Sequence, residues 1–309
     1  MLTKSGLRLG IGLPQVFSDR RVDTGLIREF AVRAEHLGYE DLWLTESILG
    51  GRPLLDPVTV LTYAAACTQR IRLGVSVIIL NQRNPVQLAK ALASLDQLSD
   101  GRLTVGVGLG GGTTRYPAFG INEDRPVARF TESLRVMRAL WSEERVTLHG
   151  DFYRLADVQM EPKPLQQPHL PVWIGAHVPA ALRRAVRLGD GWMGAGSARI
   201  ESFFEQIAQV RRNMTELQRD ASRFTLSKRI YIAVDADQAR ARDQLAATLT
   251  STYGPAIAAQ NVGVAGTANQ CIEILRSMRD AGLDHLLLQP CGDAMQQIEV
   301  LTNEVAPEL

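Results

Sequence analysis

Strand-like and helix-like segments alternate along the whole chain, and this alternation restricts the folds that the sequence can adopt. In residues 7–13, apolar side chains recur at every second position, which is typical of a strand. After Asp23, a good helix N-cap, apolar residues follow helical spacing until Gly38, which can take the left-handed conformation that ends a helix. This stretch therefore predicts one strand followed by one helix.

The same unit recurs to the end of the chain. Helix starts are predicted near Pro57, Pro85 and Pro179, and a nearly continuous apolar third strand is typical of a parallel strand covered on both faces. Eight alternating strands and helices can close without edges, so the sequence predicts a single (β/α)8 TIM-barrel domain over residues 1–309, with an open doubly wound sheet as the alternative. The predicted strands are residues 7–13, 42–44, 71–80, 103–107, 172–174, 192–193, 230–234 and 283–288.

Two segments interrupt the alternation and are predicted to be insertions after strand 4 and before strand 5. Residues 110–124 form a glycine-rich loop, and residues 144–171 contain a predicted hairpin around Gly150 and a proline-rich stretch. Barrel enzymes build their active sites from loops at the C-terminal ends of the strands. Both insertions are therefore candidate substrate walls.

Composition and charge exclude several classes of protein. The formal net charge of +1, with both signs interspersed, leaves no basic stripe for nucleic acid. There is no run of about 18 apolar residues and no leader-like N-terminal segment, so we expect a soluble, cytoplasmic protein without membrane contact. The cysteines, which are odd in number and never in C-x-x-C spacing, predict neither a disulfide framework nor a zinc site; they are Cys67, Cys271 and Cys291.

A glycine pattern follows the fourth predicted strand. Gly106, Gly108 and Gly111 satisfy G-x-G-x-x-G, but Pro117 stands where a phosphate-binding helix should begin, and this is the fourth unit rather than the first. We interpret the glycines as close approach of the backbone to a flat ligand, with tight loop packing as the alternative.

Glu46 follows the second predicted strand, where a carboxylate can point into the barrel mouth. It is a candidate catalytic residue, and the alternative is a salt bridge to a nearby arginine. No Ser-His-Asp arrangement and no metal-binding set is readable, so we expect a bound cofactor to carry the chemistry. The histidines are scattered, at His36, His149, His169, His177 and His285.

Several longer motifs resemble one family over nearly the whole chain. They include residues 68–74 (TQRIRLG), 94–103 (SLDQLSDGRL), 162–164 (PKP), 171–175 (PVWIG) and 189–192 (GDGW). Together they resemble the luciferase-like monooxygenase superfamily, and within it the branch of F420-dependent oxidoreductases.

The resemblance implies a cofactor, either the deazaflavin F420 or FMN, with its ring in the barrel mouth. It also implies a non-proline cis peptide between Ser76 and Val77 that supports the ring. We expect the third-strand pair and the glycines after strand 4 to lie beside the ring, and small residues after strands 5 and 6 to hold the phosphate through backbone N–H groups. The predicted cofactor-binding residues are Ser76, Val77, Gly108, Gly110, Gly111, Gly175, Ala176, His177, Val178, Gly194, Ala195 and Gly196.

The sequence departs from the family pattern at two positions. Ser47 replaces a histidine after Glu46, which leaves these two residues as the candidate catalytic pair without a histidine acid or base. Gly111 stands where the sugar-phosphate dehydrogenases of the family have a glutamate, so that substrate class is disfavoured.

The resulting expectation is hydride transfer between F420 and a small organic substrate. The alternatives are FMN-dependent monooxygenation and a non-catalytic flavin-binding barrel. Arg52 or Arg115 is predicted to meet the oligoglutamate tail of F420. The oligomeric state stays open, with a homodimer as one option.

Overall fold

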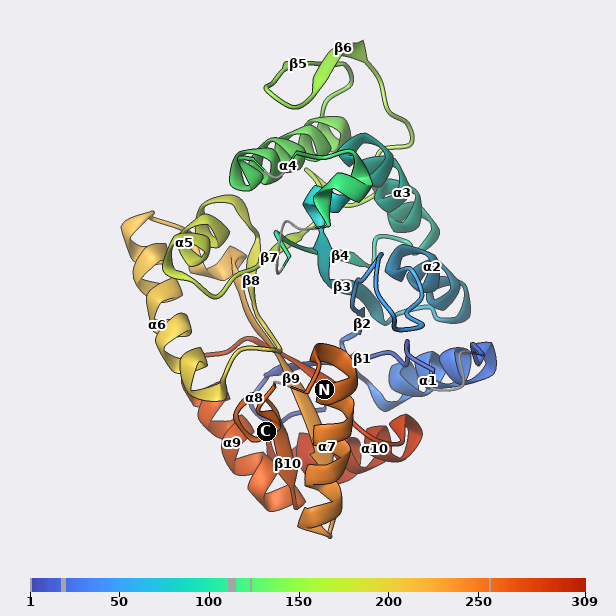
Figure 1. The fold of residues 1–309 in the computed structure, drawn as a ribbon, viewed down its shortest axis with the longest axis vertical. Helices are drawn as coiled ribbons and strands as arrows, with labels where there is room; N and C mark the ends of the chain where they lie inside the picture. The colour runs from blue at the N-terminus through green and yellow to red at the C-terminus, as the bar shows by residue number, and fades with distance from the viewer. Residues whose placement is uncertain (1, 18–20, 111–114, 123, 256) are drawn as a thin grey trace.

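A closed barrel of eight parallel strands forms the centre of the molecule, as predicted. The computed structural model describes residues 2–17, 21–110, 115–122, 124–255 and 257–309. Figure 1 shows the strands around the centre of the view, with the helices outside them. In order around the barrel, the strands are β1 (Arg8–Gly12), β2 (Asp41–Leu44), β3 (Arg72–Ile79), β4 (Leu103–Gly108), β7 (Val172–Gly175), β8 (Gly191–Gly194), β9 (Thr225–Val234) and β11 (His285–Pro290).

The helices begin and end where local side chains favour it. Asp23 accepts a hydrogen bond from the N–H of Leu26 at 2.9 Å at the start of α1, and Gly38 ends that helix at φ 89°. Asn84 caps α3 in the same way. The helices are α1 (Thr24–Leu37), α2 (Pro57–Cys67), α3 (Pro85–Leu98), α4 (Pro126–Ser142), α5 (Pro179–Leu188), α6 (Ile200–Glu216), α7 (Gln238–Tyr253), α8 (Ala259–Val262), α9 (Ala268–Asp280) and α10 (Ala294–Val300).

The two ends of the chain meet in the barrel. Strand β1 pairs with β11, with Ile11 opposite Leu288, and Lys4 lies 3.5 Å from Glu308 in an exposed ion pair. Because strands from opposite ends of the sequence are hydrogen-bonded neighbours, we propose that residues 1–309 form one domain.

The seventh barrel strand is longer than predicted, and one additional strand was not predicted. Strand β9 begins at Thr225 rather than Ile230, because Ser227, Lys228 and Arg229 are buried strand residues despite their polarity. A short strand, β10 (Val264–Gly266), pairs with the end of β9 beyond the point where β8 stops. The hairpin is present as β5 (Val146–His149) and β6 (Arg154–Val158).

Two indole side chains fill the middle of the barrel interior. The rings of Trp43 and Trp173 stack with centroids 5.2 Å apart, and both residues are buried. Gly74 provides part of the room: a Cβ there would lie 2.5 Å from Trp43 Cε3. Likewise a Cβ at Gly191 would lie 2.7 Å from Trp173 Cδ1. The interior is therefore packed below its C-terminal end.

We expect Gly74→Ala to lower the free energy of unfolding by about 1–3 kcal/mol, because the added methyl would overlap an indole that cannot move away. The measurement is urea denaturation. Gly51→Ala is the matched control, since a Cβ at Gly51 has no atom within 4 Å. A Gly74→Ala protein with the wild-type denaturation midpoint would show that the Trp43 indole can shift at little energetic cost.

Candidate active site

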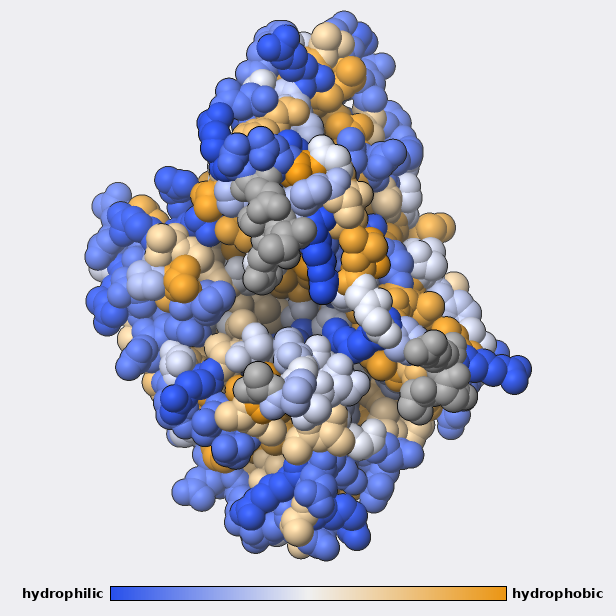
Figure 2. Space-filling model, in the orientation of Figure 1, coloured by the Kyte–Doolittle hydropathy of each residue, from blue (hydrophilic) through white to orange (hydrophobic). Residues whose placement is uncertain are grey.

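One cavity at the C-terminal end of the barrel brings together most of the predicted cofactor-binding residues. Its volume is about 360 Å³, within the usual range for small-molecule sites. In Figure 2 the surface is hollowed near the centre of this face. The predicted residues that line it are Ser76, Val77, Gly108, Gly110, Gly175, Ala176, His177, Val178, Ala195 and Gly196.

Val77 forms the floor of this cavity. The Ser76–Val77 peptide bond is cis, as predicted, and the pairing of β3 with β4 shifts register between Val75 and Ile78. Glycines flank the Val77 side chain: a Cβ at Gly108 would lie 2.8 Å from Val77 Cγ2, and one at Gly175 would lie 3.2 Å from Val77 Cγ1. The floor is therefore a single small side chain between two bare stretches of backbone.

Two other predicted glycines do not line the floor. Gly194 lies behind the cavity, where a Cβ would be 2.9 Å from Lys228 Cδ. Gly110 lines the cavity rim at φ 79°, a conformation that favours glycine. Gly111 lies outside the described residues.

The opposite wall carries small residues and a helix start. Residues 176–178 and 195–197 line it, and α5 begins at Pro179 with Val178 as an N-cap that makes no side-chain hydrogen bond. Arg184, one helical turn further on, also lines the cavity, and its Nε is buried without a partner among the described residues. This wall therefore combines the N-terminal end of α5 with the positive charge of Arg184.

Two adjacent basic residues on β9, which the sequence analysis missed, lie close to the cavity: Arg229 lines it, and Lys228 lies behind it on the other face of the strand. Lys228 is fully buried, and its Nζ donates to the carbonyl oxygen of Ala195. Burial, with a smaller contribution from Arg229, lowers the pKa of Lys228 to about 7. Arg229 lines the cavity directly and bonds to Tyr231 and Tyr253. The available sequence signal was a run of three polar residues, 227–229, beside an apolar strand.

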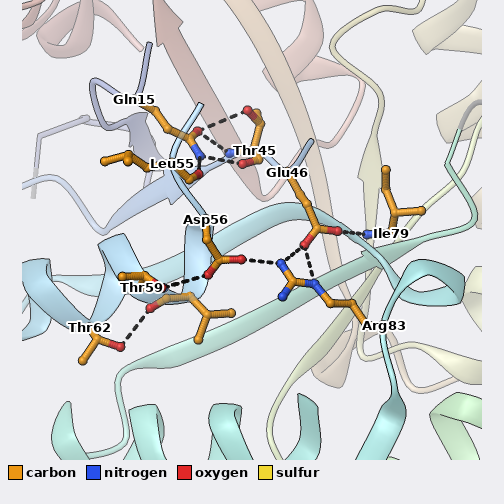
Figure 3. A network of polar contacts seen from close by, with 10 residues as sticks. Gln15, Thr45, Glu46, Leu55, Asp56, Thr59, Thr62, Ile79 and Arg83 are labelled. Atoms are coloured by element: carbon orange, nitrogen blue, oxygen red, sulfur yellow. Dashed lines mark hydrogen bonds and ion pairs between the residues drawn. The ribbon is translucent and has the colours of Figure 1, made fainter. Parts of the chain in front are cut away.

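Glu46 holds strand ends together and does not line the cavity. As Figure 3 shows, its carboxylate accepts from Arg83 Nε at 2.9 Å and from the N–H of Ile79 at 2.6 Å, while Arg83 Nη2 also lies 2.5 Å from Asp56 Oδ2. The side chain of Glu46 is fully buried. The arrangement is the salt bridge that the sequence analysis kept as the alternative.

The environment of Glu46 affects its charge. Burial raises the pKa of the Glu46 carboxyl above its usual range, although Arg83 and the Ile79 N–H oppose this shift. Ser47, the other candidate catalytic residue, donates to the carbonyl oxygen of Leu49 at 3.2 Å and is also absent from the cavity lining. Glu46 therefore contacts the end of β3, and Ser47 contacts the loop that follows it.

A Ser-His-Asp chain, which was not readable from the sequence, lies beneath the indole layer. Ser227 Oγ is 2.7 Å from His285 Nδ1, and His285 Nε2 is 2.9 Å from Asp41 Oδ1. All three residues are buried, and the ring centroid of His285 is 5.1 Å from that of Trp173. This hydrogen-bonded series of side chains joins β2, β9 and β11, and none of its three residues lines the cavity described above.

A second cavity of about 340 Å³ adjoins the first on the β1 and β11 side. Tyr231 lines this cavity, whereas its hydrogen-bonding partner Arg229 lines the first. Gln289 reaches over Gly12, where a Cβ would lie 2.3 Å from its Oε1. The remaining lining consists mainly of hydroxyl, amide and small residues, with Arg52 as a cation: Leu13, Pro14, Gln15, Val16, Thr45, Arg52, Ala247, Thr248, Ser251, Thr252, Pro290, Gly292 and Ala294.

The predicted insertions have different positions. Gly110, from the insertion at residues 110–124, lines the first cavity. No residue of 144–171 lines either cavity, so these linings do not support the prediction of a substrate wall there. Instead Glu132 of α4 accepts hydrogen bonds from backbone N–H groups of residues 151–153 and fixes the hairpin against that helix. Arg115 donates to the carbonyl oxygen of Leu49 at 2.5 Å.

Two classes of site find no support in the part of the chain that the structure describes. Among those residues, no group of three or more histidine, cysteine or acidic side chains could hold a metal ion. No described helix has the length and apolar character needed to cross a bilayer.

The structure is a (β/α)8 barrel with a cavity at its mouth, a floor flanked by glycines and two arginines in the lining. These features are typical of a barrel that binds a ligand. Residues 9–263 match the family model described as luciferase-like monooxygenase, and the chain belongs to this family.

Curated relatives carry different cofactor names. An F420-dependent glucose-6-phosphate dehydrogenase from Kineococcus radiotolerans is 31% identical over 226 residues, which are 70% of this chain and 66% of that protein. An FMNH2-dependent dimethylsulfone monooxygenase from Pseudomonas putida is 30% identical over 159 residues, 50% of this chain and 43% of that one. The matched stretches thus span less than two thirds of either relative.

A solved F420-dependent secondary alcohol dehydrogenase, in complex with an F420–acetone adduct, has the same fold. It superposes with a TM-score of 0.84 at 21% identity and covers 97% of this chain and 98% of its own.

We expect Glu46→Gln to lower the free energy of unfolding by about 1–3 kcal/mol, because the amide N–H groups would face the donors of Arg83 and leave a buried group unsatisfied. Chemical denaturation measures this. Asp157→Asn, which breaks the exposed pair with Arg145, is the control and should cause no measurable change. Unchanged stability together with lost turnover would instead support the catalytic role predicted for Glu46.

We expect Lys228→Met to flatten the pH dependence of stability between about pH 7 and 10, because unfolded lysine keeps its proton up to about pH 10. With the folded pKa of Lys228 at about 7, the unfolded state binds more protons in this window. Wild-type stability therefore rises with pH there, by up to about 1.4 kcal/mol per pH unit from this residue. Denaturation midpoints measured across the window test this. Lys4→Met, at an exposed lysine, should keep the wild-type slope, and an unchanged slope in Lys228→Met would contradict the prediction.

Proposed function

We propose that this protein is an F420-dependent oxidoreductase that transfers a hydride between F420 and a small organic substrate. The observation that carries the proposal is the charge of the mouth cavity. Among the described residues, its lining includes Arg184 and Arg229 and no aspartate or glutamate. F420 carries a phosphate and an oligoglutamate tail, and therefore more negative charge than FMN. The F420-dependent names of a curated relative and of a structural neighbour support the same cofactor.

The floor of the cavity fits a flat ring. Val77 stands between Gly108 and Gly175, and any larger residue at either glycine would fill the space above the β3 bulge. When bound there, the deazaflavin would accept or donate a hydride at its C5 carbon. The chain needs to hold ring and substrate in contact for the hydride step. When the substrate is an alcohol, its hydroxyl proton is released as the hydride leaves and would pass to solvent; a ketone would take up a proton in the reverse direction.

The phosphate fits the wall opposite the floor. The N-terminal end of α5 carries a positive partial charge beside Val178, which favours an anion there, and Arg184 adds a full positive charge. The unpartnered Nε of Arg184 supports this assignment, since a buried donor without an acceptor is unfavourable. FMN carries the same phosphate, so this wall alone does not separate the two cofactors.

We assign the substrate to the second cavity, next to Tyr231 and Gln289. Gln289 has no side-chain hydrogen bond to the described residues, so its amide is free to bind a hydroxyl or carbonyl group. Arg52 is the cation among the described lining residues and would receive an acidic substituent or the cofactor tail. The alternative function, FMN-dependent monooxygenation, is favoured by the FMNH2-dependent relative.

Titration of the purified protein with F420 and with FMN tests the proposal. We expect tighter binding of F420, with an affinity that falls as salt rises, because its tail adds charge. Arg184→Met should weaken both cofactors by about tenfold or more, the loss expected for one charge-assisted hydrogen bond. Arg187→Met, an exposed arginine on the same helix outside the cavity, is the matched control and should bind as wild type does.

Substrate-dependent absorbance change of bound F420 then measures turnover. Alcohols and ketones are the first substrates to test, and glucose 6-phosphate should be inactive, as the glycine at position 111 predicts. Tighter binding of FMN, with oxygen consumption by the reduced complex, would move the protein to the monooxygenase alternative. Binding of F420 without turnover of any substrate class would favour the non-catalytic barrel.

A further inference from the structure

Arg229 is a buried guanidinium that reaches from β9 to the bulge of β3. Its Nη1 donates to the carbonyl oxygen of Ser76 at 2.8 Å. Its Nη2 donates to Tyr231 Oη at 2.8 Å and to Tyr253 Oη at 2.6 Å. Only 7% of the residue is exposed, and burial raises the pKa of Tyr231 above its usual range, which keeps this phenol neutral. Every partner of the cation is therefore uncharged.

No described carboxylate balances this charge. None of the ion pairs among the described residues includes Arg229, and the neighbouring Lys228 is a second basic group. A buried charge without a counter-ion is unfavourable unless a ligand provides one. Apart from Arg229 itself, the titratable groups that line or adjoin the cavity in the described part of the chain are basic or phenolic: His177, Arg184, Lys228, Tyr231 and Tyr253.

One nitrogen atom of Arg229 makes no hydrogen bond. Its Nε is buried and has no hydrogen-bond partner among the described residues. Gly196, which lines the same cavity, packs against it, and a Cβ there would lie 2.6 Å from the Nε. A cation without a counter-ion and a donor without an acceptor, at one position in the cavity wall, both call for an anionic acceptor in the cavity.

We propose that Arg229 supplies the counter-charge for an ionised cofactor ring, the anion formed when the 8-hydroxyl group of oxidised deazaflavin loses its proton. The inference rests on the proposed function, because FMN has no such hydroxyl. The charge of this anion is delocalised between the 8-oxygen and the C2 carbonyl oxygen, so either edge of the ring is an acceptor for a guanidinium. Arg229 therefore selects the ionised deazaflavin over the neutral flavin ring.

The ring and the phosphate are distinguishable as partners of Arg229. The probes are F420, the phosphate-free chromophore 8-hydroxy-5-deazariboflavin, and riboflavin, whose ring is uncharged at neutral pH. The ionised deazaflavin absorbs at longer wavelength than its neutral form. The absorbance of the bound chromophore against pH therefore reports the pKa of the ring hydroxyl independently of turnover.

Wild-type protein should lower the pKa of the bound ring hydroxyl by about one unit or more, which equals about tenfold preference for the anion. Arg229→Gln should abolish this shift and weaken the phosphate-free chromophore by the same factor, while riboflavin binding changes by less than about twofold. Arg229→Lys, which keeps the charge, should retain most of the shift. Tyr253→Phe, which removes a neutral partner, should leave it nearly intact.

An unshifted ring pKa in the wild-type complex would overturn the inference, and so would equal shifts in wild type and Arg229→Gln. Equal weakening of riboflavin would show that Arg229 only shapes the cavity. Weakening of F420 without weakening of the phosphate-free chromophore would assign Arg229 to the phosphate and also overturn it. If Arg229→Gln does not fold, the wild-type and Arg229→Lys titrations decide. Failure of wild-type protein to bind F420 at all would contradict the proposed function itself.

Discussion

The stacked pair of Trp43 and Trp173 divides the barrel into a packed half and an open half, and the rest of the structure depends on this division. A barrel of eight strands has an interior just wide enough for side chains to fill. Below the pair, polar groups are closed off from solvent. Above it, glycines of β4 and β7 leave the space over Val77 open. The indoles thus form the base on which a ligand cavity can exist without a hole through the core.

Strand β9 connects the packed half with the open half. Along one strand, Ser227 joins the buried polar chain, Arg229 reaches the first cavity, and Tyr231 lines the second. These residues alternate with side chains that face the helices, as the period of two requires. Strand β9 therefore places buried polar side chains at three successive levels of the barrel interior, where apolar side chains are usual.

The sequence predicted the barrel well and the site unevenly, for identifiable reasons. Small residues at strand ends, such as Gly108 and Gly175, have few roles in a parallel barrel other than close backbone approach, so their place in the cavity could be read from position and resemblance. Arg229 could not be found in this way, because a run of polar residues is typical of a loop, and only the pairing of β9 with three other strands shows that it is buried. Glu46 was expected at the mouth, but its direction depends on Arg83, which is 37 residues away in the chain.

The buried Ser227–His285–Asp41 chain has a consequence for how function is inferred from geometry. Its distances fall within those of a hydrolase triad, so a template search based on distances alone would assign this barrel to the esterases or peptidases. Yet the serine meets Nδ1 and the aspartate meets Nε2, the reverse of the usual order, and the indoles block any path by which an acyl group could arrive. Such a search would therefore return a false positive here. The three residues have the spacing of a triad, but they only connect barrel strands to one another.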